Sequence, residues 1–75
     1  MTLDQLNVNE KAIISGYLGN DISSARLLEL GLIAGEPVMV IKKAPFGDPI
    51  EIRIMNYNLC LRKKEASIIE IQTNG

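Results

Sequence analysis

The clearest pattern in the chain is an alternation of apolar and other residues in its second half. Between residues 50 and 55, isoleucine occupies every even position, and the odd positions hold Glu, Arg and Met. Successive side chains of a strand point to opposite faces, so this period of two predicts a strand with one buried face. The same period predicts strands over residues 37–41 and 57–62, and places Tyr57 on the buried face of the second.

Two shorter apolar runs rich in β-branched residues predict the first and last strands, over residues 11–18 and 67–71. A glycine inside a strand often marks a bulge, so we expect Gly16 to interrupt the first of them. Short helical turns are predicted over residues 2–6, where a Thr and a Gln have capping-box spacing, and over residues 62–66.

One longer helix is predicted between the first two strands. Asp21 or Ser23 can cap its N-terminus, and the pattern carries it through Leu30. Gly31 follows, and a glycine there can adopt the left-handed conformation that ends a helix. We therefore expect a Schellman motif, in which Leu32 packs against the last helical turn.

The predicted connections are tight turns with one exception. Residues 33–36 form a turn before the second strand, and Asn56 is expected to take positive φ between the third and fourth strands. Between the second and third strands lies the loop Ala44–Pro49, which reads APFGDP. This loop carries more side-chain specificity than a hairpin needs, so function is expected there.

These elements predict a mostly β chain that forms a small SH3-like β-barrel. It has about five strands, one α-helix between strands 1 and 2, and short helical turns, within one domain over residues 1–75. Short strands with tight turns favour a closed barrel, which removes exposed edges. A single helical turn before the last strand is a feature of SH3-like barrels.

Composition argues against most chemistry. The 75 residues include no histidine and one cysteine, Cys60, so neither an imidazole base nor a thiolate metal cluster is available. The chain has no phosphate-binding P-loop and no clustered carboxylates, and we expect no catalysis, cofactor or metal. The lack of a signal peptide, of a long apolar run and of a second cysteine predicts a cytoplasmic protein.

Three groups of residues remain for binding. Phe46 either folds back over an open end of the barrel or anchors a partner, since aromatic residues dominate contact energy at interfaces. Asp48 is interpreted as structural, accepting backbone N–H bonds within its turn. The runs Lys42-Lys43 and Arg62–Lys64 are either solvated faces or, if adjacent, one basic patch for an acidic partner. Cys60 is expected to be an idle surface thiol.

Three segments occur in order and at fixed spacing. They read RLLELGLIAGEPVMV (residues 26–40), KKAPFGDPIEIRI (residues 42–54) and YNLCLRKKEA (residues 57–66). Together they resemble the FeoA family, the small cytoplasmic component of bacterial ferrous iron transport. The resemblance implies an SH3-like barrel without catalytic activity that acts beside FeoB, the membrane permease with a cytoplasmic GTP-binding domain.

The leading hypothesis is therefore an accessory protein that docks on the cytoplasmic part of FeoB. Its partner-binding residues are predicted to be Phe46, Asp48, Arg26, Leu30, Lys42 and Lys43. One alternative is a regulatory, peptide-binding barrel like the C-terminal domain of DtxR-type iron-dependent repressors. Another is a small barrel that binds nucleic acid through its lysines and arginines, although the net charge of −1 argues against it.

Overall fold

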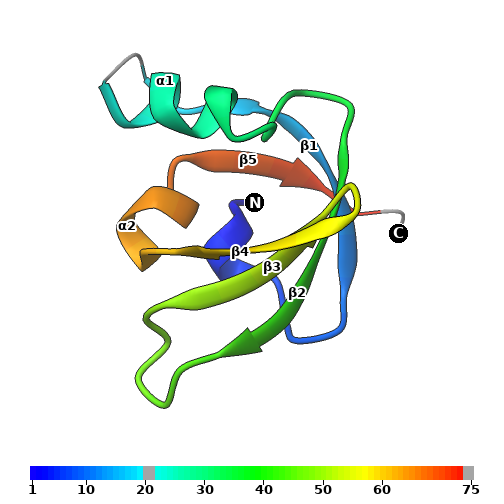
Figure 1. Ribbon diagram of the computed structural model, residues 1–75, viewed down its shortest axis with the longest axis vertical. Coiled ribbons are helices and arrows are strands. Elements are labelled where there is room, and N and C mark those ends of the chain that lie inside the picture. Colours follow the sequence, from blue (N-terminus) through cyan, green and yellow to red (C-terminus); the bar gives the residue numbers. More distant parts are fainter. Residues whose placement is uncertain (20–21, 74–75) are drawn as a thin grey trace.

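Five antiparallel strands curl around one core, as the computed structural model shows for residues 1–19 and 22–73 (Figure 1). The elements in chain order are η1 (Leu3–Gln5), β1 (Lys11–Tyr17), α1 (Ile22–Glu29), β2 (Pro37–Lys43), β3 (Ile50–Ile54), β4 (Tyr57–Leu61), α2 (Lys63–Ala66) and β5 (Ile69–Gln72). This confirms the mostly β class, the helix between the first two strands and the helical turn before the last.

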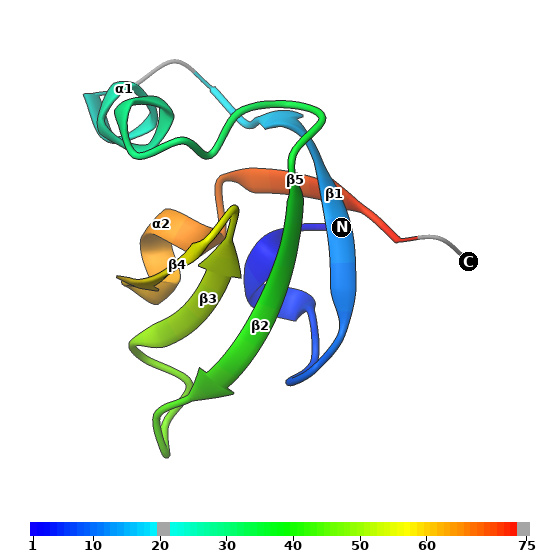
Figure 2. The same ribbon diagram turned by 45° about the vertical axis from the view of Figure 1, so that its right-hand side comes forward.

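The strand order in the sheet is β4-β3-β2-β1-β5. β4 and β5 are thus its two end strands, and α2 connects them where the sheet curls round (Figure 2). The N-terminus covers the outer edge of β5, because the Ile71 amide donates to the Met1 carbonyl over 2.9 Å and Thr2 bridges Glu70. β4 and β5 do not pair with each other, so the barrel that the strands form is open between them, and α2 lies at this opening.

The core is built from the alternating faces. Ile50, Ile52 and Ile54 are all buried, and they belong to one core cluster with the buried valines of β2, with Leu3 of η1 and with Leu6. In β1 the register with β5 shifts between Ile14 and Gly16, which confirms the expected bulge. Burial of this apolar face supplies most of the stability of so small a domain.

The end of α1 has the predicted Schellman geometry. The Leu32 amide donates to the Leu27 carbonyl over 3.1 Å and the Gly31 amide to the Leu28 carbonyl over 3.0 Å, with Gly31 at φ +98°. Leu27 and Leu32 are both buried. The helix proper ends at Glu29, one residue before the prediction. The caps expected from Asp21 and Ser23 fall outside the described residues and side chains.

Most predicted boundaries differ from the structure by one or two residues, and two of the differences concern specific residues. The turn between β3 and β4 does contain a residue with positive φ, but it is Met55 at +54° and not Asn56. The last strand begins at Ile69 instead of residue 67, because the amides of Ser67 and Ile68 still donate to the Lys63 and Glu65 carbonyls of α2. Neither difference changes which residues face the core.

Candidate partner-binding site

The loop between β2 and β3 presents Phe46 to solvent. The Gly47 amide donates to the Ala44 carbonyl over 2.8 Å and the Ala44 amide to the Pro49 carbonyl over 3.0 Å, which closes the loop with backbone bonds. The Phe46 residue at its tip is 95% exposed. It does not fold back over the barrel, so that alternative is wrong. An aromatic ring held out on an ordered loop is available to a partner.

Asp48 stabilises the start of α2 and not its own turn. Its Oδ1 accepts a hydrogen bond from the Lys63 amide over 3.0 Å, where Lys63 is the first residue of α2. The first amides of a helix lack intrahelical acceptors, and a carboxylate suits them. Asp48 is therefore structural as predicted, with a different partner, and it connects the loop to α2.

Glu65 connects α2 to α1, a role that the sequence analysis missed. This residue is only 8% exposed, and its two carboxylate oxygens have different partners. Oε1 accepts from the Arg62 amide over 2.9 Å, and Oε2 forms an ion pair with the Arg26 guanidinium. It is the one ion pair among residues 1–19 and 22–73. The spacing of Arg62 and Glu65, three residues apart at a helix start, was the signal available for the first bond.

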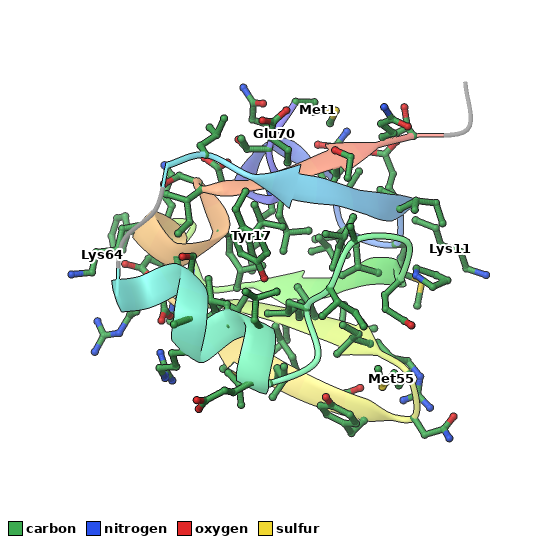
Figure 3. All side chains as sticks on the ribbon, turned by 90° about the horizontal axis from the view of Figure 1, so that it is seen from above. Met1, Lys11, Tyr17, Met55, Lys64 and Glu70 are labelled. Atoms are coloured by element: carbon green, nitrogen blue, oxygen red, sulfur yellow. The ribbon has the colours of Figure 1, made fainter. Side chains whose placement is uncertain are left out.

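We call the surface formed by Arg26, Asp48 and Arg62–Glu65 the α2 face. A shallow pocket of about 470 Å³ lies here, lined by Arg26, Pro49, Cys60, Leu61, Arg62, Lys64 and Glu65. A second hollow beside it is lined by Asp48, Arg62 and Lys64. The Lys64 side chain projects outward from α2 (Figure 3). The α2 face therefore joins two of the predicted binding residues, Arg26 and Asp48.

Leu30 lies at the other end of α1 and is held by a tyrosine from β4. The Tyr57 hydroxyl donates to the Leu30 carbonyl, and Leu30 packs half-buried against the core. Tyr57 itself is 39% exposed, so its predicted burial is wrong. As the first residue of an end strand, it lies beyond the fully buried part of the core and below the end of α1.

The two lysines of β2 do not reach the α2 face. Lys42 is exposed and lies opposite Glu51 in the register of β2 and β3, so β3 separates it from β4. The Lys43 ammonium donates to the Asp4 carbonyl of η1 over 3.2 Å. The two basic runs therefore do not form one patch.

The predicted binding residues are spread along one side of the molecule. Both ribbon views place the β2–β3 loop and α1 at opposite ends, with α2 between them (Figures 1 and 2). The loop that carries Phe46 is therefore not a neighbour of the segment 26–32. The α2 face is their shared neighbour, through Asp48 on one side and Glu65 on the other.

The rest of the described chain offers little chemistry. No three His, Cys, Asp or Glu side chains gather into a metal-binding group among residues 1–19 and 22–73. Cys60 is exposed, as expected. Burial raises the pKa of the Tyr17 phenol, whose hydroxyl donates to the Leu32 carbonyl. Over the same residues, no helix combines the length and apolar character needed to span a bilayer.

Comparison with known proteins identifies the protein family to which the chain is similar. The model of the FeoA domain matches residues 1–73. A curated relative, the Fe(2+) transport protein A/Fe(2+) transporter FeoB fusion protein of Porphyromonas gingivalis, is 36% identical over 72 residues. The match covers 96% of this chain and 8% of that protein, so the chain corresponds to a small part of the relative.

Solved structures agree. A FeoA-like protein from Clostridium acetobutylicum superposes with a TM-score of 0.93 at 28% identity, covering 100% of this chain and 87% of that one. FeoA of Stenotrophomonas maltophilia in complex with zinc, described as a prokaryotic SH3 domain protein, gives 0.84 at 30% identity, covering 96% and 89%. The fold is therefore SH3-like, as predicted. A manganese-dependent transcriptional repressor shares this fold with a TM-score of 0.87 at 14% identity, over 97% of this chain and 41% of that one.

Proposed function

The chain belongs to the FeoA family, and from this membership we propose that it is a non-catalytic, cytoplasmic accessory of ferrous iron uptake that docks on the cytoplasmic part of FeoB. The observation that carries the proposal is the Porphyromonas gingivalis relative. There, a segment matching nearly all of this chain shares one polypeptide with an Fe(2+) transporter, FeoB. Covalent linkage gives two domains a high effective concentration, which favours domains that bind each other.

The surface of the chain is consistent with docking. Phe46 is 95% exposed on a loop closed by two backbone hydrogen bonds, so an interface could bury it without reorganising the loop. An exposed aromatic side chain of this kind loses little entropy on binding and contributes a large apolar area. The adjoining α2 face supplies charged groups around this apolar point, the arrangement usual at an interface.

The test is a calorimetric titration of this chain into the purified cytoplasmic region of FeoB, and into full-length FeoB in detergent. Saturable binding to at least one is expected. Phe46→Ala should weaken that binding by more than about 1 kcal/mol, or about fivefold. Leu18→Ala, which shortens a half-exposed apolar side chain elsewhere in the chain, is the control and should bind like the wild type. Absence of saturable binding to either form of FeoB would refute the proposal.

No specific observation favours either alternative, the repressor-like peptide-binding barrel or the nucleic-acid-binding barrel. The likeness to the manganese-dependent repressor, at 14% identity, extends to the fold alone. The nucleic-acid hypothesis relies on Lys42 and Lys43 together with residues 62–64. In the structure β3 separates Lys42 from β4, and Lys43 donates to the Asp4 carbonyl of η1. Docking on a protein is therefore the function that the geometry favours.

A further inference from the structure

We propose that the α2 face binds an acidic, extended segment of a protein partner, with the side chains of Arg62 and Lys64 as the principal contacts. The proposal rests on the proposed function, because the partner envisaged is FeoB, and it goes further by naming the surface and the chemistry of the segment. Three features support this inference: the charges of the α2 face, the shape of its pocket and the neighbouring loop.

The cations of the α2 face are in excess and its anions are already engaged. Glu65 accepts from the Arg62 amide and pairs with Arg26, and Asp48 accepts from the Lys63 amide. The side chains of Arg62, Lys63 and Lys64 are all exposed, and none of them is in an ion pair within the described part of the chain. A cationic surface thus stands on a protein whose net charge is −1. Such a local field attracts anionic groups.

The pocket gives this charge a defined place. Arg26 from α1 and Arg62 at the N-terminus of α2 line the same hollow of about 470 Å³, with Pro49 and Leu61 as apolar neighbours. Arg62 and Lys64 also line the adjoining hollow. A guanidinium can bind a carboxylate through two parallel hydrogen bonds, and an ammonium accepts a carboxylate from many directions. Two neighbouring hollows suit successive acidic side chains of one extended segment.

The same features favour a peptide over a phosphate backbone or an anionic membrane. The cations are few and lie around two hollows, and they do not extend as a continuous basic surface. Nucleic-acid surfaces usually carry a broad basic excess with stacking aromatics. Phe46, at the tip of the loop that Asp48 joins to α2, offers an apolar anchor on the same side of the molecule.

The main experiment compares two matched double variants. Arg62→Gln/Lys64→Gln neutralises the α2 face. Lys11→Gln/Arg53→Gln removes one lysine and one arginine from a hollow on the outer face of β1, β2 and β3, and Lys11 and Lys64 lie on opposite sides of the molecule (Figure 3). Each is titrated into the cytoplasmic region of FeoB at about 50 mM and about 300 mM NaCl.

We expect the α2-face variant to lose about tenfold or more in affinity at low salt and the control less than about threefold. The loss should shrink at high salt, where charges are screened. Equal losses in both variants, or wild-type affinity in the α2-face variant, would overturn the proposal. All variants bear substitutions of exposed side chains, and far-UV circular dichroism verifies that each is folded.

A second measurement keeps the inference separate from the proposed function. The ¹⁵N-labelled chain is titrated with a hexaglutamate peptide, with a short oligothymidylate and with vesicles containing phosphatidylglycerol. Hexaglutamate should shift the amide signals of residues 61–66, and the other two probes should not. Shifts confined to another face, no shifts, or stronger binding of the oligonucleotide or vesicles would refute the inference. If FeoB does not bind but hexaglutamate maps to α2, the proposed function fails and the acidic-segment site stands.

Discussion

Replacing Gly31 by alanine should destabilise the chain by about 2–3 kcal/mol, and the structure separates this into two terms. The first is conformational. Gly31 ends α1 at φ +98°, a region that residues with a Cβ rarely adopt. Forcing an alanine into such a left-handed conformation costs about 1–2 kcal/mol. This term depends only on the backbone and would be present even if nothing surrounded the new methyl group.

The second term comes from a neighbour. A Cβ built on Gly31 would lie 2.8 Å from the Tyr57 hydroxyl oxygen, closer than carbon and oxygen atoms approach without a bond. That hydroxyl donates to the Leu30 carbonyl, so it must move and lose its hydrogen bond. The loss of one such bond costs about 1 kcal/mol. The Met55 methyl group, at 3.5 Å, is in ordinary contact and adds little.

Gly35→Ala isolates the first term. Gly35 has nearly the same φ of +96°, and its Cβ would have nothing within 4 Å. It should therefore lose only the conformational term, about 1–2 kcal/mol. Urea unfolding followed by far-UV circular dichroism measures both variants, with the slope m compared to verify two-state behaviour. A third variant, Gly31→Ala combined with Tyr57→Phe, removes the hydroxyl that the methyl group would meet.

Two results would refute the contribution of the Tyr57 hydroxyl to the cost of Gly31→Ala. If Gly31→Ala and Gly35→Ala cost the same within about 0.3 kcal/mol, the Tyr57 hydroxyl does not lie where the structure has it. In the Tyr57→Phe background, the cost of Gly31→Ala should fall by about 1 kcal/mol. An unchanged cost in that background would also refute the second term, because no coupling would then join the two residues.

Three further predictions concern other parts of the chain. Glu65→Gln should cost about 1–2 kcal/mol in urea unfolding, because a nearly buried carboxylate loses its charge beside Arg26. Glu70→Gln is the control and should cost less than about 0.5 kcal/mol, because the Glu70 side chain forms no ion pair in the described part of the chain. Equal costs would contradict the role of the Arg26 pair. Phe46→Ala should change stability by less than about 0.5 kcal/mol, since the ring is almost fully exposed; a larger loss in the same assay would place it against the fold. Burial raises the pKa of Tyr17 above its ordinary value of 10.0, so the unfolded chain loses this proton first. The protonated Tyr17 therefore contributes fully to the free energy of unfolding below pH 10.0, and this contribution is lost as the pH rises through the folded pKa. Unfolding curves measured across this pH range should show a smaller decline for Tyr17→Phe than for the wild type.

Local rules were enough to predict most of the fold. The alternation over residues 50–55 identified β3 and its buried face, because period two leaves little choice of structure. Gly31 marked the end of α1, because few other residues tolerate the conformation needed there. Each of these predictions depends on a few neighbouring residues of the sequence. They differ from the structure only at element boundaries, for example where the positive φ belongs to Met55 and not to Asn56.

Residues whose environment comes from distant parts of the chain could not be predicted in this way. Tyr57 has the right period for burial, but alternation decides only which face a side chain points to and not what covers it. Its partner, the Leu30 carbonyl, belongs to another element. The hydrogen bond between Glu65 and the Arg62 amide could be predicted from their spacing of three residues. The ion pair of Glu65 with Arg26, 39 residues away, depends on how α1 crosses the barrel.

This division matters for testing the proposed binding surface, because some of its residues also hold the fold together. Arg26, Asp48 and Glu65 each bond to another element, so replacing them can weaken binding merely by displacing α1 or α2. Phe46 and Lys64 have no such bond in the described structure, and their substitution should leave stability nearly unchanged. A loss of affinity at these two positions therefore reports on contact with the partner. A loss at the first three must be divided between contact and fold by measuring unfolding free energies alongside it.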